Sequence, residues 1–256
     1  QWCRKPPEDP IRPDGIDADR GREIIRRARS RGLEGEDGSL WVSTGDSMAL
    51  LDAYGVGFAS SRIVSEAEGA ADAQREIGGP VAVKVDAPIH KADVGGVVLG
   101  CETPEEAAEA VHRIRRALEE AGEERYGRTL VVQAMVEEGV QLAAGLRRDP
   151  VFGPVSMIGL GGELLELMDD VAVRLPPLTE REAREMVESL KAYPLLDGYR
   201  GQPARDVGAL LDLIHRLGAL AMDVGALLEL DLNPVFVGKK GVLAADVRLR
   251  LASEES

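Results

Sequence analysis

The feature that most constrains the fold is a regular alternation of strand-like and helix-like segments separated by glycine or proline turns. From Ser43 onwards, short runs rich in β-branched residues, such as Val81–Val85, alternate with helical runs, such as Glu66–Ile77. Two helical runs begin with capping boxes, at Thr103–Glu106 and Thr179–Glu182. In a capping box the threonine oxygen accepts from the amide three residues on, and the glutamate reaches back. We therefore predict an α/β fold.

The length of 256 residues is enough for two lobes with separate cores. Residues 1–37 are rich in proline, arginine and acidic residues, and only Gly21–Arg31 is predicted to form a short helix. We interpret residues 1–37 as a linker or the tail of a preceding domain. We expect an N-terminal lobe at 38–135 and a C-terminal lobe at 136–256. Because the chain begins with Gln1 rather than Met, we expect it to be part of a longer polypeptide.

Charge and composition exclude several classes of protein. The net charge of −14, from 31 basic and 45 acidic residues, repels nucleic acid and acidic membranes. No apolar run approaches the roughly 18 residues of a membrane helix, and the N-terminus has no signal-peptide pattern. Cys3 and Cys101 have no metal-type spacing and make no disulfide framework, which fits a cytoplasmic protein.

A lysine-containing strand and a glycine loop form the first candidate site. In Val81–Val85 the valines share one face, so Lys84 points to the other and must reach solvent or a fixed anion. The loop that follows carries His90 and Lys91 and then the pair Gly95 and Gly96. Glycine lets backbone amides approach phosphate oxygens closely, so this segment is a candidate phosphate cradle, although it lacks the P-loop pattern. A lysine reaching solvent from the sheet face remains the alternative.

His90 is the candidate nucleophile of that loop. A neutral imidazole nitrogen beside a phosphate site can attack phosphorus and form a phosphohistidine. The local sequence is equally compatible with a histidine that only contacts phosphate or caps a helix.

The last predicted hairpin supplies a candidate metal site. Its strands are expected at Leu228–Val237 and Val242–Leu249, joined by a four-residue turn. The first strand places Glu229, Asp231 and Asn233 on its polar face. If Val237 faces Val242, the register places Asn233 opposite Asp246, with Cβ atoms about 4.5–5.5 Å apart. Oxygen ligands of this kind suit Mg²⁺, whereas an ordinary solvated strand face explains the same pattern.

Several segments, in order, resemble one known family. They are LLDAYGV (50–56), PVAVKV (80–85), HKADVGGV (90–97), RDPVFGP (148–154), GLGGELLEL (159–167), YRGQPARD (199–206) and ELDLNP (229–234). Together they resemble the ATP-grasp part of ADP-forming acyl-CoA (acetyl-CoA) synthetases, a part also found fused in bacterial protein acetyltransferases. The resemblance covers about four fifths of the chain, from Asp46 to Leu251.

The resemblance implies an ATP-grasp fold, in which two α/β lobes clamp a nucleotide, and a ligase reaction: acyl-CoA + ADP + phosphate ⇌ carboxylic acid + CoA + ATP. His90 matches the histidine that passes phosphate from a CoA-binding partner domain or subunit to ADP. That partner handles CoA and the small carboxylic acid. The remaining implied roles fall to two sets of residues: Lys84, Lys91, Gly95, Gly96, Gln133, Met135, Val136 and Gln141 for the ATP/ADP cofactor, and Asp231, Asn233 and Asp246 for Mg²⁺.

Three departures separate the chain from the family pattern. Gln141 stands where a G-x-E-x-x-x-G glutamate is usual, Ala92 replaces a serine, and the segment from Lys84 to His90 is about two residues shorter. The retained His90 and Lys84 favour a catalytic half of the synthetase. Gln141 favours a non-catalytic, nucleotide-sensing module of a protein acetyltransferase. An ATP-grasp ligase that joins a carboxylate to an amine is less compatible with the HKADVGGV segment.

Overall fold

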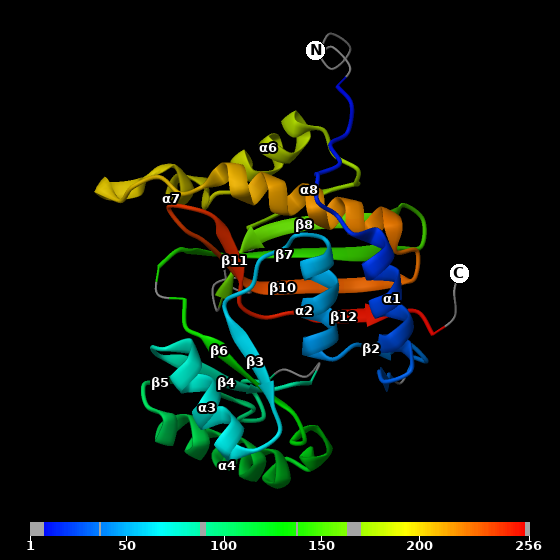
Figure 1. Ribbon diagram of the computed structural model, residues 1–256. Helices are drawn as coiled ribbons and strands as arrows, with labels where there is room; N and C mark the ends of the chain where they lie inside the picture. The colour runs from blue at the N-terminus through cyan, green and yellow to red at the C-terminus, as the bar shows by residue number, and fades with distance from the viewer. Residues whose placement is uncertain (1–7, 36, 88–90, 137, 163–169, 254–256) are drawn as a thin grey trace.

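The computed structural model describes residues 8–35, 37–87, 91–136, 138–162 and 170–253, and it shows two lobes, each built on one sheet (Figure 1). The strands pair antiparallel in both sheets. The larger sheet has the order β1-β2-β12-β10-β7-β8-β9, with β11 beside β10. Its strands are β1 Leu33–Glu34, β2 Leu40–Trp41, β7 Val140–Asp149, β8 Gly153–Leu160, β9 Val171–Arg174, β10 Leu227–Val237, β11 Val242–Ala244 and β12 Arg248–Leu251. The smaller sheet has the order β3-β6-β4-β5, with strands β3 Ser61–Val64, β4 Val81–Val85, β5 Val97–Cys101 and β6 Leu130–Ala134.

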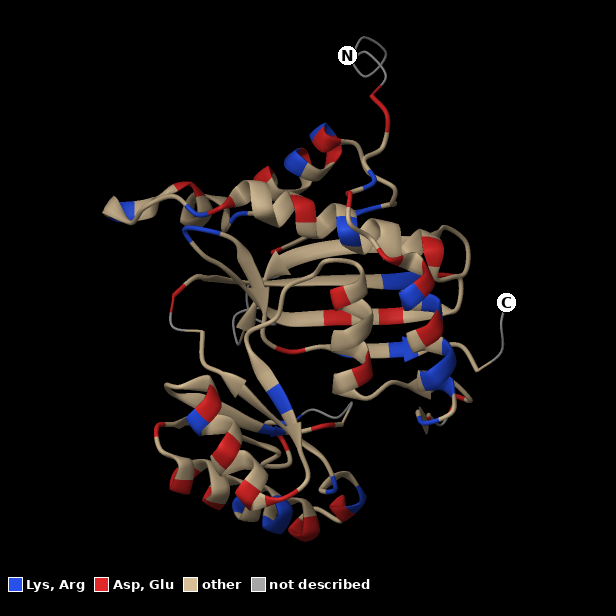
Figure 2. Cartoon of the chain, viewed as in Figure 1, with Lys and Arg blue, Asp and Glu red and all other residues tan. Residues whose placement is uncertain are grey.

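The helices divide between the two sheets. Helices α3 and α4 pack on the smaller sheet and turn charged residues outwards, whereas α6 and α8 pack on the larger one (Figures 1 and 2). The helices and 3₁₀ turns are α1 Ala18–Arg29, α2 Thr44–Ala53, α3 Ala67–Ile77, α4 Pro104–Glu120, η2 Glu124–Tyr126, α6 Glu180–Glu188, α7 Tyr193–Asp197, η4 Tyr199–Gly201 and α8 Val207–Asp223. Both predicted capping boxes are present, at the starts of α4 and α6. None of the helices in the described part of the chain is long and apolar enough to span a bilayer.

The smaller lobe is organised by the alternation predicted for β4. Val81, Val83 and Val85 are fully buried in the core that this sheet shares with Ile114 and Leu118 of α4. Burying each of these side chains contributes about 1.5–3 kcal/mol. The intervening residues of β4 face the other side of the sheet, towards the larger lobe.

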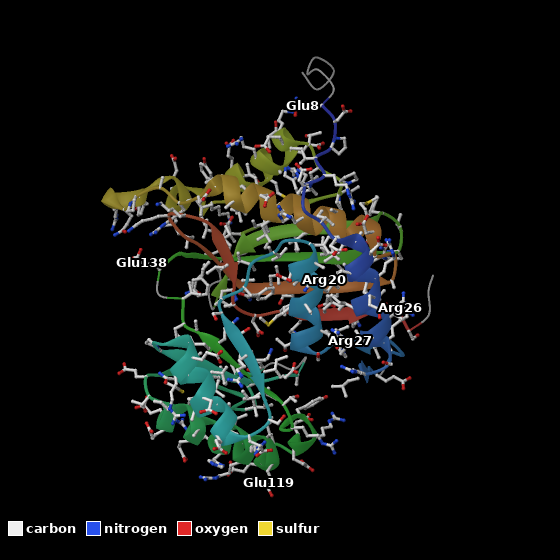
Figure 3. The ribbon with its side chains drawn as sticks, in the orientation of Figure 1. Glu8, Arg20, Arg26, Arg27, Glu119 and Glu138 are labelled. Carbon is white, nitrogen blue, oxygen red and sulfur yellow. The ribbon has the colours of Figure 1, made fainter. Side chains whose placement is uncertain are left out.

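The segment before β3 packs with the larger lobe. Helix α1 lies against α2, and two ion pairs join them: Arg20–Asp52 at 2.8 Å and Arg27–Asp46 at 2.5 Å (Figure 3 labels both arginines). Strand β2 pairs with β12 of the larger sheet. The sheet pairing therefore groups residues 18–53 with the larger lobe.

That grouping differs from the division expected from the sequence, which put residues 1–37 in a linker and 38–53 in the N-terminal lobe. The physical reason is the apolar side of α1, where Ile24 and Ala28 are buried in the larger core. This side is narrow, and the arginines around it dominate the local composition. The Gly21–Arg31 helix itself is confirmed as α1.

The last hairpin has the predicted register, but its second strand is not continuous as predicted. Val237 pairs with Val242, as expected, and Asp231 pairs with Arg248, which continues the same register. The single strand predicted at Val242–Leu249 is instead split into β11 and β12. Pro234 lies opposite the break, and because proline has no N–H to donate, the ladder is interrupted there.

Asp206 ties α8 to the turn between β10 and β11. Its carboxylate accepts from the amide of Ala209, as the helix N-cap, at 2.9 Å, and from the amide of Gly241 at 2.8 Å. These two backbone hydrogen bonds hold the pKa of Asp206 below its ordinary value. One carboxylate therefore satisfies two backbone donors from elements far apart in the sequence.

We predict that Asp206→Ala lowers the free energy of unfolding by about 1–3 kcal/mol, since a cap and a turn hydrogen bond are lost. Because the folded pKa is depressed, the contribution of Asp206 is present above about pH 3.9, the ordinary value, and is lost as the pH falls through the folded pKa. Urea unfolding at neutral and acidic pH measures both effects.

Asp206→Asn is the matched control, because asparagine is also a good N-cap and keeps an oxygen acceptor. It should retain most of the stability at neutral pH and lose the acid dependence. Equal destabilisation by the alanine and asparagine substitutions would contradict the role given to the two hydrogen bonds.

Candidate functional site

A cleft of about 610 Å³ lies between the two sheets. The smaller lobe contributes β4, β5, β6 and residues 91–93 between β4 and β5. The larger lobe contributes β7, β10 and the segment between β11 and β12. Its lining includes nine of the predicted site residues: Lys84, Lys91, Gln133, Met135, Val136, Gln141, Asp231, Asn233 and Asp246. The tertiary structure thus brings together segments that are up to 162 residues apart (246 − 84) in the chain.

Lys84 carries an ammonium group buried in the wall of the cleft. The side chain alternates with the core valines of β4, as predicted, and is only 7% exposed. Its Nζ donates to the carbonyl oxygen of Ala245 at 2.6 Å, across the cleft. Burial lowers the pKa of Lys84 to about 8; Asp246 opposes this shift and Lys91 adds to it. A buried cation of this kind is poised to interact with an anion.

Lys91 and Asp246 form an ion pair across the same cleft. The Nζ atom of Lys91 lies 3.0 Å from both carboxylate oxygens of Asp246. The lysine side chain is 5% exposed and the aspartate side chain 26%. Asp246 therefore faces two lysines of the smaller lobe, which gives the cleft one carboxylate set among cations.

Oxygen atoms from β10 extend this polar wall. The side-chain oxygen of Asn233 accepts from the amide of Gly162 at 3.0 Å, and Asp231 lies two residues along the same strand. Asp246 follows opposite in the hairpin register, although the ladder is interrupted there. Within the described residues no cluster of three or more His, Cys, Asp and Glu side chains could hold a metal. The side chains of Asn233 and Asp246 offer oxygen ligands of the kind that Mg²⁺ takes.

The segment that joins the lobes leaves β6 at the rim of the cleft. Gln133 is almost fully buried, and its side-chain nitrogen donates to the carbonyl of Ala59 at 3.5 Å. The amide of Met135 donates to the carbonyl of Pro80 at 3.0 Å. Val136 also lines the cleft, and within the described residues its backbone takes part in no hydrogen bond outside the regular elements. Gln133, Met135 and Val136 therefore lie together at the cleft, and their contact with a nucleotide base stays a prediction.

The glycine loop only partly meets its prediction. His90 lies outside the described residues. The amide of Gly96 donates to the carbonyl of Lys91 at 2.6 Å, and that of Gly95 to the carbonyl of Ala92 at 3.3 Å. Neither glycine lines the cleft. Their amides close the turn that places Lys91, so a phosphate-contacting role for the two glycines stays a prediction.

The chain is similar to known proteins over most of its length. The model of the ATP-grasp domain matches residues 35–251. The chain belongs to the ATP-grasp domain family. The structure agrees with this family, because two lobes with separate cores lie on either side of the cleft.

This ATP-grasp domain is similar in sequence to ADP-forming acetate–CoA ligases, both to a separate subunit and to part of a single-chain enzyme. It is 33% identical to the β subunit of ADP-forming acetate–CoA ligase I of Pyrococcus furiosus, covering 91% of this chain and 98% of that subunit. It is 37% identical to ADP-forming acetate–CoA ligase I of Archaeoglobus fulgidus, covering 93% of this chain but 34% of the enzyme. The chain thus spans about a third of the length of such single-chain relatives.

A solved structure matches as well. The dinucleotide-forming acetyl-coenzyme A synthetase 1 of Ca. Korarchaeum cryptofilum, in complex with coenzyme A and Mg-AMPPCP, has a TM-score of 0.76 and 34% identity, covering 90% of this chain and 99% of that chain. In that structure a phosphohistidine segment points towards the nucleotide-binding site. The ATP-grasp fold predicted from the sequence is confirmed.

Two apolar residues of β5 and one aspartate near the cleft of this ATP-grasp domain were not predicted from the sequence. Val97 and Leu99 of β5 line the cleft, and Leu99 is 65% exposed. The sequence feature that could have identified Val97 and Leu99 is their spacing of two residues, directly after Gly95 and Gly96, which places both side chains on one face of a strand. Asp86 was missed too: its carboxylate accepts from the amides of Thr44 at 2.7 Å and Gly45 at 3.4 Å, which links the end of β4 to the start of α2.

We predict that Lys84→Met raises the free energy of unfolding by about 1–3 kcal/mol at pH 7, because a buried ammonium is replaced by an apolar side chain of similar length. The folded pKa of about 8 lies below the ordinary value of about 10.4. Between these values the unfolded wild type binds more protons, so its stability rises with pH relative to the variant. Urea unfolding at pH 7 and near pH 10 should show that the difference in free energy of unfolding between Lys84→Met and the wild type becomes smaller at the higher pH.

Lys240→Met provides the comparison, since Lys240 is exposed in the turn after β10. It should leave both stability and its pH dependence unchanged. If the free energies of unfolding of the wild type and Lys84→Met differ by the same amount at both pH values, burial does not depress the pKa of Lys84.

Proposed function

We propose that this ATP-grasp domain is the nucleotide-binding, phosphoryl-transferring part of an ADP-forming acyl-CoA synthetase. The observation that carries the proposal is the cleft itself, where two lysines from the smaller lobe face Asn233 and Asp246 of the larger lobe. Cations on one wall and oxygen ligands on the other suit a magnesium-bound nucleoside diphosphate or triphosphate. The reaction is acyl-CoA + ADP + phosphate ⇌ carboxylic acid + CoA + ATP.

Nucleotide phosphates bind to Lys84 and Lys91 in this proposal. Asn233 and Asp246 hold Mg²⁺, with Asp231 beside them on β10. When bound, Mg²⁺ neutralises charge on the phosphoryl oxygens. Lys91 then exchanges its contact with the Asp246 carboxylate for the phosphate, so the ion pair keeps both groups in position for binding.

The base occupies the rim between β5 and the hinge. Val97 and Leu99 offer apolar surface from one side, and Phe236 of β10 offers an aromatic ring from the other. In this proposal the backbone of Val136 recognises the edge of the base; its position in the lining of the cleft supports that role. A planar heterocycle between apolar side chains, with one backbone contact at its edge, is a common arrangement for such ligands.

His90 carries the phosphoryl group between the partner and ADP. A neutral ring nitrogen of His90 attacks the phosphorus of the partner's phosphohistidine, and the partner's imidazole leaves. A terminal oxygen of ADP then attacks the phosphorus held by His90, which forms ATP and returns a neutral imidazole. The cations of Lys84 and Lys91 stabilise the negative charge of the transferring group.

A CoA-binding domain or subunit completes the enzyme. The support is the length of the match, since single-chain relatives are about three times as long as the region they share with this chain. The separate β subunit of P. furiosus indicates that the two parts also occur as different polypeptides. CoA and the small carboxylic acid bind through that partner.

A nucleotide-sensing module of a protein acetyltransferase is the second candidate. Gln141 is the observation that favours it, because a neutral amide lines the cleft where the family pattern has a carboxylate. In that case nucleotide binding persists, but His90 is never phosphorylated. Both candidates place the nucleotide in the same cleft.

Calorimetric titration with Mg·ADP should show one binding site in the wild-type chain, and Asn233→Ala/Asp246→Ala should weaken the affinity about tenfold or more, since both proposed metal ligands are removed. Repeating the titration with excess EDTA separates the metal-dependent part, because the variant should then resemble the wild type.

Asp72→Ala is a matched control for the loss of a carboxylate, since Asp72 is exposed on α3 and, in the described part of the chain, pairs with Arg75 alone. Its affinity should equal that of the wild type. A double variant that binds Mg·ADP as tightly as the wild type would rule out a metal role for Asn233 and Asp246.

Replacing His90 by alanine should leave the affinity for Mg·ADP within about twofold and abolish phosphoryl transfer, because the proposed mechanism has His90 bind only the transferring group. The assay mixes the chain with its CoA-binding partner and labelled acetyl phosphate or ATP, and follows acid-labile protein phosphate on each polypeptide. Phosphate that still reaches ADP in the variant would exclude the relay. Nucleotide binding without any phosphorylation of the wild type would favour the sensing module.

A further inference from the structure

A second cavity of about 820 Å³ adjoins the nucleotide cleft and shares Gln141 and Pro234 with it. The segment that contains Tyr199, Arg200 and Arg205 forms its outer wall. Figure 2 shows basic residues along this part of the chain, between α7 and α8. Among the described residues that line the cavity, none is acidic, although the whole chain carries a net charge of −14.

The guanidinium group of Arg205 is the strongest sign of a ligand. Its Nε and Nη1 atoms are shielded from solvent and have no hydrogen-bond partner among the residues that the structure describes. Arg148, by contrast, donates to the carbonyls of Leu227, Ala221 and Val224. Two nitrogens of Arg29 are shielded and unpaired in the same way as those of Arg205, but Arg29 does not line this cavity. A shielded guanidinium without acceptors is unfavourable unless something else supplies them.

The loop around Arg200 holds a backbone conformation that is rare for a residue with a side chain. Arg200 has φ 51° and ψ 43°, and it lies between Gly198 and Gly201, which also have positive φ. Its guanidinium lies 5.2 Å from the centre of the Tyr199 ring. Non-glycine residues held in this conformation cluster at ligand-binding sites. The loop therefore presents a second guanidinium on the same wall as Arg205.

The inner wall connects this cavity to the proposed metal ligands. Gly161 leaves no space for a side chain, since a Cβ atom would lie 2.4 Å from the carbonyl of Leu142. Gly162 has φ 68°, and its amide donates to the side-chain oxygen of Asn233. An occupant of the cavity would thus be separated from Asn233 by a single residue.

We propose that this arginine cavity binds an oxyanion of the phosphate class, held by Arg200 and Arg205. Guanidinium groups match the geometry of phosphate oxygens and are weakly hydrated, so a shielded cavity suits them better than it suits lysine. Asp206, the nearest acidic neighbour in sequence, is already engaged with the amides of Ala209 and Gly241. The proposal does not depend on the phosphotransfer role of His90.

The test is calorimetric titration of the full chain with inorganic phosphate. Binding should weaken about tenfold or more in Arg205→Met and less strongly in Arg200→Met, because each loses a charged hydrogen-bonding group. Arg62→Met, an exposed arginine on β3, should match the wild type. Lys84→Met/Lys91→Met should also keep phosphate binding, since its lysines lie in the other cleft.

A second measurement guards against misfolding. Phosphate should raise the melting temperature of the wild type but not of Arg205→Met, as expected for a ligand of the native state. If Arg205→Met does not fold, Arg200→Met carries the comparison. Phosphate binding that is lost in the lysine variant and kept in both arginine variants would overturn the proposal, as would the absence of saturable binding to the wild type.

Two sources of phosphate are separated by repeating the titration with saturating Mg·ADP. Phosphate that still binds through Arg205 shows that the cavity accepts a free anion beside the nucleotide. Competition by Mg·ADP that disappears in Arg205→Met shows that the cavity takes a phosphate of the nucleotide itself. If neither phosphate binding nor competition by Mg·ADP changes in Arg205→Met, the cavity is not an oxyanion site. That result would leave the conclusions from the Mg·ADP and His90 experiments unchanged.

Discussion

The burial of the Lys84 ammonium group is the constraint on which the site depends. An apolar strand places the lysine where solvent cannot stabilise its charge, and burial lowers its pKa accordingly. The carbonyl of Ala245 and the carboxylate of Asp246 supply the compensating oxygens. Both belong to the short segment that leaves the sheet between β11 and β12. The break in the hairpin is therefore what allows the larger lobe to meet the lysines of the smaller one.

Polar contacts, rather than one continuous apolar core, join the two lobes around the cleft. The apolar residues form two separate clusters, one for each sheet. Across the cleft, Lys84 meets Ala245 and Lys91 meets Asp246. Outside the cleft, Asp86 of the smaller lobe meets the start of α2. Lobes with separate cores can move relative to each other at lower cost than a single core can deform. This arrangement suits a site in which charged contacts exchange when a nucleotide and a metal bind.

Asn233 lies between the nucleotide cleft and the arginine cavity. Its side-chain oxygen accepts from the amide of Gly162, and Gly162 lines the arginine cavity. Gln141 reaches both spaces from β7. One hydrogen bond and one shared side chain thus connect the walls of the two spaces. The neutral side chain of Gln141 also keeps a negative charge away from the wall that the two arginines share.

Local sequence determined the elements and much of their register. The valines of β4, the capping boxes of α4 and α6, and the pairing of Val237 with Val242 follow from periodicity and turn chemistry, which depend on near neighbours. The resemblance of several short segments identified the ATP-grasp fold. Only the tertiary structure decided that α1 packs on the larger lobe, that Lys91 pairs with Asp246, and that Arg205 lines a second cavity. Those contacts join residues far apart in the chain, and their energies depend on burial and distance, which no local pattern encodes.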